Sequence, residues 1–396
     1  MSKLNKIIIF STLLIILLTV PSYSKASSDL KVAGWIPYWR TSEGIKDAKK
    51  HLNLLDYIYP FVFTVKSDGS LSDQGDLEKS SWQRLFKEAR TKNVKIIPTV
   101  MWSNGALIQT ILSDQSKRED HIDEIVNMVE EGNFDGVDID YEAKQSITKD
   151  YFSLFLKELK EKLPKNTDLV CTIEARTPPQ SLYRSLPPIL SYANDYTAVG
   201  EHCDIVQIMA YDQQRADLLL NDVRKGAPYA PTADVEWVRK VVELTIQSIP
   251  KEKIMLGIPT YGAEYEVTVS PNWYQGYKKL WSLNPEYGVK TAKKYKIKPS
   301  TNSAGELAFS YIPKENGFKL EKNMDIPNNT PSGLKVATEA LAQANKTGQT
   351  IKFNYVSWSD AKAVKDKVDL AKSLDLRGVS IFKIDGGEDK NIWKLF

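Results

Sequence analysis

Histidine and cysteine are scarce in this chain of 396 residues, which holds three histidines and two cysteines. His51, His121 and His202 lie far apart and show none of the spacings that zinc-binding motifs need, so we expect no metal site and no other cofactor. Cys171 and Cys203 stand near the starts of two neighbouring predicted strands. They can form a disulfide or remain two buried thiols, and the sequence alone leaves both open.

A strong excess of charge of either sign is also missing. The formal net charge is +3, and we find no basic stripe with interleaved aromatic residues, so we expect no nucleic-acid partner. Hydrophobic residues make up 42% and charged residues 26% of the chain, which is ordinary for a soluble globular protein. The length suffices for one large barrel domain plus a smaller unit.

An apolar run occurs at the N-terminus, where Ile7 to Val20 follow two lysines. Pro21 and several small residues up to Ala26 come next. This order is typical of a secretory signal peptide, and the run is shorter than the roughly 20 residues that a membrane-spanning helix needs. We therefore predict a signal peptide at residues 1–26 and a secreted or extracytoplasmic mature protein without a membrane span. An uncleaved anchor is the alternative.

Short apolar segments recur along the rest of the chain and alternate with helical periodicities. Eight of them predict strands, at residues 31–36, 56–63, 94–100, 134–142, 169–174, 205–212, 253–259 and 378–382. Strands that alternate with helices pair in parallel, and eight such units predict an α/β fold, a (β/α)8 TIM barrel. A doubly wound sheet is the alternative, but no glycine-rich turn follows the first strand.

The alternation is interrupted after the seventh strand by a segment too long for a structureless loop in a compact domain. Its aromatic residues suffice for a small core of its own: Trp273, Tyr274, Tyr277, Trp281, Phe309 and Tyr311. We therefore predict a barrel made of residues 30–262 and 359–396. Residues 263–358 are predicted to form a small α+β insertion subdomain between strand seven and its following helix.

The fourth predicted strand carries acids. Side chains on a strand alternate between its two faces, so Asp138, Asp140 and Glu142 point the same way, with apolar residues between them. Carboxylates this close cannot all ionise near neutral pH, and one should hold a proton, as a general acid must. A solvated acidic patch or a calcium loop is the alternative, but the apolar alternation does not fit an EF-hand.

The segment from Asp135 to Glu142 resembles the Asp-x-x-Asp-x-Asp-x-Glu signature of glycoside hydrolase family 18, the chitinase family. Met209 to Asp212 and Gly257 to Gly262 resemble the family's Met-x-Tyr-Asp and Gly-x-Pro-x-Tyr-Gly motifs at strands six and seven. The resemblance covers nearly the whole mature chain. It implies a TIM-barrel hydrolase of β-1,4-linked N-acetylglucosamine polymers that retains configuration by using the substrate's own acetamido group.

The resemblance also implies roles for four catalytic residues. Glu142 would protonate the glycosidic oxygen, and Asp140 would orient the acetamido N–H and offset the developing positive charge. Asp138 would modulate Asp140 by sharing a proton, and the hydroxyl of Tyr211 would hydrogen-bond the acetamido oxygen. The partner of the protein is then a polysaccharide.

Seven residues at strand ends are expected in the substrate pocket: Trp35, Phe61, Trp102, Met209, Asp212, Tyr261 and Phe382. The two tryptophans can instead be core residues, although their place at strand ends favours the pocket. The chain also departs from the family. Thr99 to Trp102 stand where the family usually has Ser-x-Gly-Gly, Phe382 replaces the usual Trp, and Ala263 replaces a frequent Arg. These departures leave chitin and peptidoglycan both open as substrates.

Two further functions are open. A chitinase-like lectin would bind glycans without cutting them, but such proteins typically lack the terminal Glu of the signature, which is present here as Glu142. An aldol-cleaving barrel enzyme would need a Schiff-base lysine at a strand end. Lys383 stands at such a place, but nothing else in the sequence supports that chemistry.

Overall fold

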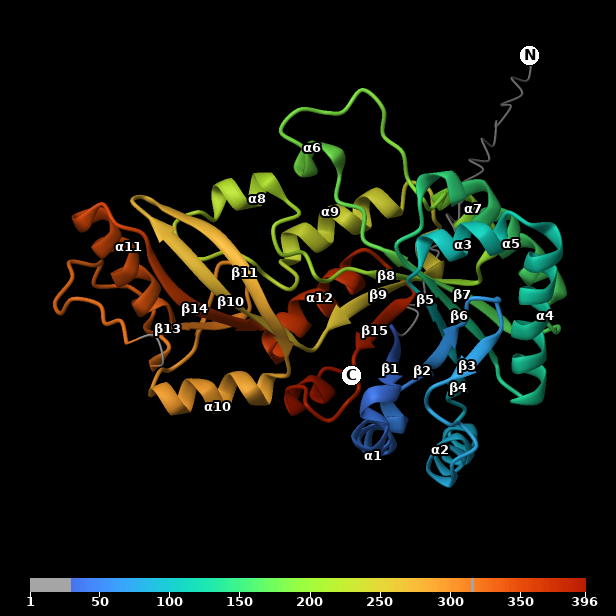
Figure 1. The fold of residues 1–396 in the computed structure, drawn as a ribbon. Coiled ribbons are helices and arrows are strands. Elements are labelled where there is room, and N and C mark those ends of the chain that lie inside the picture. The colour runs from blue at the N-terminus through green and yellow to red at the C-terminus, as the bar shows by residue number, and fades with distance from the viewer. Residues whose placement is uncertain (1–29, 315–316) are drawn as a thin grey trace, which may run out of the picture.

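The computed structural model describes residues 30–314 and 317–396, so the predicted signal peptide lies outside the described residues. Eight parallel strands form a barrel (Figure 1), which closes because β1 pairs in parallel with both β2 and β15. This confirms the predicted TIM barrel. Its strands are β1 (Lys31–Pro37), β2 (Tyr57–Val65), β5 (Thr99–Trp102), β6 (Gly136–Tyr141), β7 (Asp168–Glu174), β8 (Ile205–Met209), β9 (Ile254–Pro259) and β15 (Gly378–Phe382).

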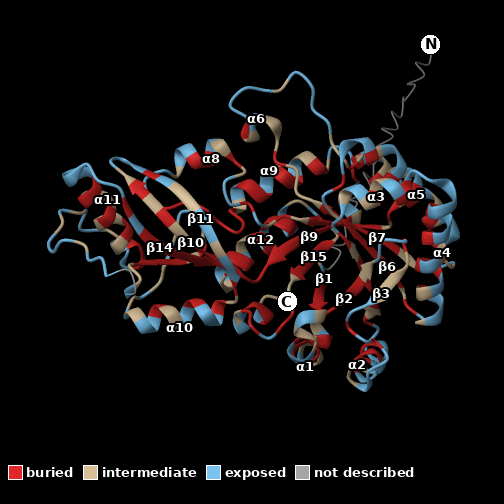
Figure 2. Ribbon diagram, viewed as in Figure 1, coloured by how far each residue is buried: buried red, intermediate tan, exposed pale blue. Residues whose placement is uncertain are grey.

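Helices surround the barrel and hide its strands from solvent. Figure 2 shows strands that are buried and helices whose outer faces are exposed. Because both faces of each strand are covered, the strands read in the sequence as nearly continuous apolar runs. The helices are α1 (Thr41–His51), α2 (Ser80–Thr91), α3 (Gly105–Leu112), α4 (Gln115–Glu131), α5 (Lys149–Lys162), α6 (Pro179–Leu182), α7 (Tyr196–His202), α8 (Leu218–Val223), α9 (Val235–Thr245) and α12 (Ala361–Ser373).

Several barrel strands are shorter than the sequence predicts, and two of the differences have a clear physical reason. The third is interrupted before Pro98, which has no N–H for the ladder, and divides into β4 (Lys95–Ile96) and β5. The sixth ends at Met209, because the N–H groups of Ala210 and Tyr211 bond back to residues of β8 itself. A short strand, β3 (Leu71–Asp73), pairs antiparallel with the end of β2.

A second, antiparallel sheet follows β9 and lies beside the barrel (Figure 1). Its strand order is β11 (Trp273–Leu283), β10 (Gly262–Ser270), β14 (Ile351–Trp358), β13 (Leu307–Tyr311) and β12 (Ser300–Thr301). Alternate residues of β14 pack on opposite faces. Phe353 and Tyr355 meet alanines of α11 (Lys335–Thr347), whereas Val356 and Trp358 share a cluster with Ala292 of α10 (Pro285–Tyr295).

Buried contacts attach the second sheet to the barrel. The carboxylate of Glu306, next to β13, accepts a hydrogen bond of 2.8 Å from the backbone N–H of Ala233, and the hydroxyl of Tyr277 accepts one of 3.0 Å from the N–H of Tyr229. The division of the chain into domains at residues 263 and 358 stays a prediction. The sequence analysis expects Trp273 and Trp281 in the core of this segment, but they are 55% and 47% exposed and lie at its surface.

The two cysteines form a disulfide that joins neighbouring barrel strands, with Cys171 in β7 and Cys203 directly before β8. This decides between the two states that the sequence leaves open. Among the described helices, none combines the length and the apolar character needed to cross a membrane.

Candidate active site

The signature acids are carried by β6, whose side chains alternate as predicted. Asp138 and Asp140 are buried, and Glu142 follows one residue beyond the strand end, partly buried. Tyr141 points the other way and stacks on Phe155 of α5. Gly136 begins the strand because a Cβ there would lie 2.1 Å from the carbonyl oxygen of Asp168 in β7, so only glycine lets the two strands approach.

Asp138 is the deepest of the three acids and is fully hydrogen-bonded. Its carboxylate accepts bonds from the indole N–H of Trp35 at 3.1 Å and from the hydroxyls of Thr99 and Thr172, each at 2.7 Å. Burial raises its pKa to about 6, and these hydrogen bonds oppose the shift. Asp138 is therefore held in one orientation by hydrogen bonds, deeper in the barrel than the other two acids.

Asp140 is a buried acid whose carboxyl group lacks hydrogen-bond donors in the described chain. The residue is 2% exposed, and its Oδ1 atom has no hydrogen-bond partner among the described residues. Burial, and then the charges of Glu142 and Asp138, raise its pKa well above the ordinary value. A buried carboxyl without donors favours its neutral form, so the surroundings of Asp140 favour the protonated acid until a ligand donates a hydrogen bond to it.

The charges of two acids from other strands act on Glu142. Burial, then the charge of Glu174 at the end of β7, and that of Asp212 beyond β8 raise its pKa, while Lys144 opposes the shift. Glu174 also fixes the turn after the acid, because its carboxylate accepts a hydrogen bond from the N–H of Ala143 at 3.2 Å. A raised pKa at the mouth of a barrel suits a group that donates a proton.

Lys144 is a charged neighbour that the sequence analysis missed. Its ammonium is fully buried, donates to the carbonyl of Tyr141, lies 3.8 Å from the carboxylate of Glu174 and stands 4.6 Å from the ring centre of Phe152. Burial lowers its pKa. The available signal was its place two residues after Glu142, although a lysine there usually suggests a solvated turn.

An aromatic cluster covers the barrel mouth. Phe382 stacks on Tyr211 with ring centres 5.4 Å apart, and it meets Trp35 and Tyr261 edge-on at 5.7 and 6.0 Å. Burial raises the pKa of Tyr211 well above its ordinary value, so its hydroxyl stays protonated and can donate. The hydroxyl of Tyr261 donates to Asp212 at 2.8 Å.

A cavity of about 570 Å³ opens beside this cluster, between the barrel and the second sheet. Two half-exposed tryptophans stand at it, Trp39 after β1 and Trp281 on β11, with 48% and 47% of their surfaces exposed. Asp212, Tyr261 and Phe382 also line it, which agrees with their predicted place in a pocket. Exposed aromatic faces next to polar groups are suited to binding sugars.

Other predicted pocket residues take different places. Trp102 faces the helices, 3% exposed and packed on Tyr141, so its predicted place in the pocket is wrong. Trp35 is 1% exposed and supports Phe382 and Asp138 from below instead of lining the cavity. Phe61 is nearly buried behind Trp39, and Met209 is partly exposed at the end of β8.

Two further residues of the sequence analysis make contacts other than those expected. Ala263 packs inside the core of the second sheet rather than on the pocket rim. Lys383 pairs with Asp385 and donates to Asn284 at 3.0 Å, so its ammonium is engaged in an ion pair. Nothing in these contacts supports a Schiff-base lysine.

Comparisons with known proteins agree with this geometry. The sequence profile described as Glycosyl hydrolases family 18 matches residues 31–387, and the chain belongs to that family. It is 21% identical over 404 residues to the uncharacterized glycosylase YvbX of Bacillus subtilis (strain 168), covering 99% of this chain and 98% of YvbX.

Two more similarities are informative. The cortical fragment-lytic enzyme of Bacillus anthracis is 22% identical over 357 residues, covering 89% of this chain and 70% of that protein. The crystal structure of a chitinase from Chromobacterium violaceum ATCC 12472 superposes with a TM-score of 0.66 at 17% identity, covering 92% of this chain and 97% of that one. This protein is therefore a glycoside hydrolase with a barrel fold that chitinases share.

Proposed function

We propose that this protein cleaves β-1,4-linked N-acetylglucosamine polymers with retention of configuration, using the acetamido group of the substrate as the nucleophile. The observation that carries the proposal is the pairing of Glu142, raised in pKa at the barrel mouth, with Asp140, a buried acid whose Oδ1 has no partner. An acetamido N–H is a donor that would satisfy that oxygen.

The proposed reaction gives each of these groups a role. Glu142 gives its proton to the glycosidic oxygen as the bond to the anomeric carbon breaks. The acetamido carbonyl oxygen attacks that carbon. Asp140 acts at this step as a carboxylate, its proton having passed to Asp138; it accepts a hydrogen bond from the acetamido N–H and offsets the positive charge of the oxazolinium ion. The hydroxyl of Tyr211 donates to the acetamido oxygen. Glu142 then takes a proton from the water that opens the ring, so the acid is restored.

The surroundings of Glu142 support substrate assistance over a carboxylate nucleophile. The family is an exception to the usual scheme of two carboxylates. Here the neighbouring acids are both engaged: Glu174 accepts from Ala143 and from Asn194, and Asp212 accepts from Tyr261 and pairs with Lys279 at 3.7 Å. Neither is positioned by its contacts as a free nucleophile.

We further propose that the protein acts outside the cytoplasm. The N-terminal apolar run supports this, as does the disulfide between Cys171 and Cys203, because disulfides persist mainly in oxidising compartments. A glycan-binding lectin is the less favoured alternative, because the acid of the signature and the groups that raise its pKa are in place.

Chitin and peptidoglycan both contain the required sugar. The similarity to an enzyme named for lysis of cortical fragments supports peptidoglycan, and the shared fold of chitinases is compatible with chitin. The test is to incubate the mature protein with chitin oligomers and with purified peptidoglycan and to identify the products by mass. We expect products ending in a reducing N-acetylglucosamine from at least one polymer. Intact substrate in both reactions would contradict the proposal.

A further inference from the structure

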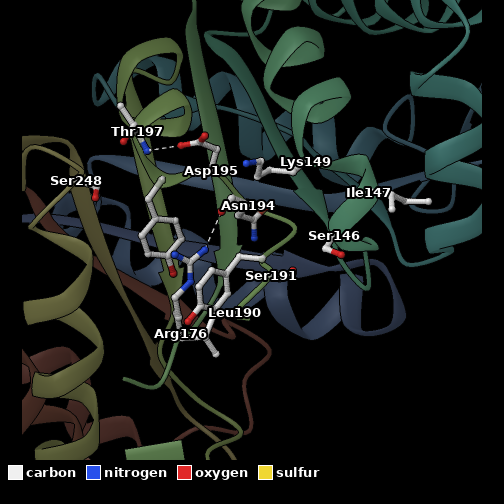
Figure 3. Close-up of a pocket in the computed structure, with 12 residues that line it drawn as sticks. Ser146, Ile147, Lys149, Arg176, Leu190, Ser191, Asn194, Asp195, Thr197 and Ser248 are labelled. Carbon is white, nitrogen blue, oxygen red and sulfur yellow. Dashed lines mark hydrogen bonds between the residues drawn. The ribbon is translucent and has the colours of Figure 1, made fainter. Parts of the chain in front are cut away.

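A second cavity, of about 430 Å³, is lined mainly by residues that follow β6 and β7 (Figure 3). Glu174 links it to the acid: its carboxylate accepts from the N–H of Ala143, the residue after Glu142, and from the side-chain amide of Asn194 at 2.8 Å, which lines the cavity. Asp212, the other acid that raises the pKa of Glu142, lines the first cavity. Each of the two acids that raise the pKa of Glu142 is therefore tied to one of the two cavities.

Arg176 is the principal cation of this second cavity. Its guanidinium lies between two aromatic rings, 3.7 Å from the ring centre of Tyr192 and 3.8 Å from that of Tyr196. One nitrogen donates to the carbonyl of Asn194 at 2.7 Å, as Figure 3 shows. Within the part of the chain that the structure describes, Arg176 makes no ion pair with a carboxylate. Stacking fixes its plane and leaves its remaining N–H groups for a ligand.

The acid that lines this cavity does not neutralise Arg176. Asp195 turns toward α7, where its Oδ1 accepts from the N–H groups of Thr197 and Ala198 at 3.0 and 3.3 Å. A second cation, Lys149, also lines the cavity, and its ion pair at 3.6 Å is with Asp150, which is 89% exposed. Exposed pairs of that kind are weak, so the cavity offers a net positive surface.

The cavity also offers an acceptor. Asn194 is 8% exposed, and its amide nitrogen donates to Glu174. Its Oδ1 has no hydrogen-bond partner among the described residues. A buried amide oxygen of this kind calls for an N–H or O–H donor from a ligand. Exposed apolar side chains, Ile147 and Leu190, stand at the rim. The ligand thus needs a carboxylate, a nearby donor and some apolar surface.

We propose that this second cavity binds a carboxylate-bearing unit of the substrate polymer, with Arg176 meeting the carboxylate and Asn194 accepting from an adjacent N–H or O–H. This rests on the proposed function and makes it more specific, since chitin carries no carboxylate and peptidoglycan does. The carboxylate can be that of the lactyl ether on muramic acid or that of an attached peptide. Arginine recognises both by the same pair of parallel hydrogen bonds.

The test is equilibrium binding by the full mature chain carrying Glu142→Gln, so that no ligand is cut. The ligands are a peptide-free tetrasaccharide of alternating N-acetylglucosamine and N-acetylmuramic acid, its methyl ester, the same tetrasaccharide with its peptides, and a chitin tetramer. We expect the free acid to bind about tenfold to hundredfold more tightly than the ester, the usual range for a charge-assisted hydrogen-bonded contact.

Adding Arg176→Gln should abolish that ratio, and Arg176→Lys, which keeps the charge but not the fork, should restore part of it. Arg184→Gln is the matched control, since Arg184 is exposed and pairs with Asp222 outside this cavity. It should leave the ratio intact. A gain seen only for the peptide-bearing ligand, and lost with Arg176→Gln, assigns the carboxylate to the peptide and supports the proposal.

Equal binding of acid and ester together with no gain for the peptide-bearing ligand, or a ratio that survives Arg176→Gln, would overturn the proposal. Thermal unfolding of each variant checks that the fold is retained. The outcome is independent of catalysis, because binding is measured without turnover. A protein that cuts neutral oligomers but shows no preference for the acid would retain its proposed function and lose only this site.

Discussion

Each of the two sheets buries a carboxylate on a strand, Asp140 on β6 and Glu264 on β10, with exposures of 2% and 0%. Glu264 receives three hydrogen bonds, from the hydroxyls of Tyr287 and Tyr311 and from the amide of Asn354. The Oδ1 of Asp140 receives none. A buried acid that its own fold satisfies contributes to structure, whereas one left without donors is available to a substrate that brings them.

The sharpest way to break this comparison is to neutralise both acids in separate variants. Asp140→Asn should lower turnover by about 10²–10³-fold, the scale of losing one preorganised electrostatic contact. The melting temperature should stay level or rise, because an uncompensated buried acid is removed. Activity on chitin oligomers and thermal unfolding measure the two effects. A stability loss with normal turnover would place Asp140 among the structural acids.

Glu264→Gln is the matched variant in the other sheet. The NH2 group that replaces one carboxylate oxygen accepts no hydrogen bond, so at least one of the three donors loses its partner and the free energy of unfolding should fall by about 1–3 kcal/mol. Turnover per folded molecule should change little. Urea unfolding followed by circular dichroism gives the first quantity. If the variant had the same free energy of unfolding as the wild type, the hydrogen bonds to Glu264 would not stabilise the fold as proposed.

Asp138 lies between these extremes, because it is satisfied by donors but deeply buried. Its pKa of about 6 in the folded chain exceeds the ordinary 3.8, so the folded state binds this proton more tightly than the unfolded state. The stabilisation is complete below pH 3.8 and is lost as the pH rises through 6. Relative to Asp138→Asn, the wild type should lose about 3 kcal/mol across that window.

Unfolding free energies of both proteins, measured at several pH values, test this sign. Taking the difference removes the contributions of other titrating acids that the two proteins share. A difference that stays flat between pH 3.8 and 6 would show that the hydrogen bonds to Asp138 cancel the effect of its burial.

The smallest expected effect concerns Lys144, the buried cation beside the acids. Its charge lowers the pKa values of Asp140 and Glu142, against the raising effects of burial, Glu174 and Asp212. Lys144→Met should therefore move the alkaline limb of the kcat/KM profile to higher pH. Lys157→Met, which neutralises an exposed lysine of α5, is the control. An unshifted limb would mean that Lys144 supports only the turn.

Much of the fold could be predicted because parallel strands covered on both faces read as apolar runs, and the acids of β6 were readable from simple alternation. The same alternation contradicts the prediction for Trp102. Thr99 points inward to Asp138, so Trp102, three residues on, points outward. A place at a strand end does not decide which face a side chain takes; its position in the alternation does.

Other features depend on contacts that one sequence does not contain. Lys144 is buried because Glu174, from the next strand, and Phe152 surround it. Trp281 is exposed at the cavity because a strand at the edge of the second sheet turns one face toward the barrel. The disulfide depends on the distance and orientation of the two cysteine side chains, which their place on neighbouring strands does not determine by itself.

The central claim is that Glu142 delivers the proton that breaks the glycosidic bond. The most direct measurement is single-turnover cleavage of an N-acetylglucosamine oligomer by Glu142→Gln, with binding of the same oligomer measured alongside. We predict that cleavage falls by at least about 10²–10⁴-fold, the usual worth of general acid catalysis, while the oligomer still binds. Cleavage by this variant at the wild-type rate would contradict the account.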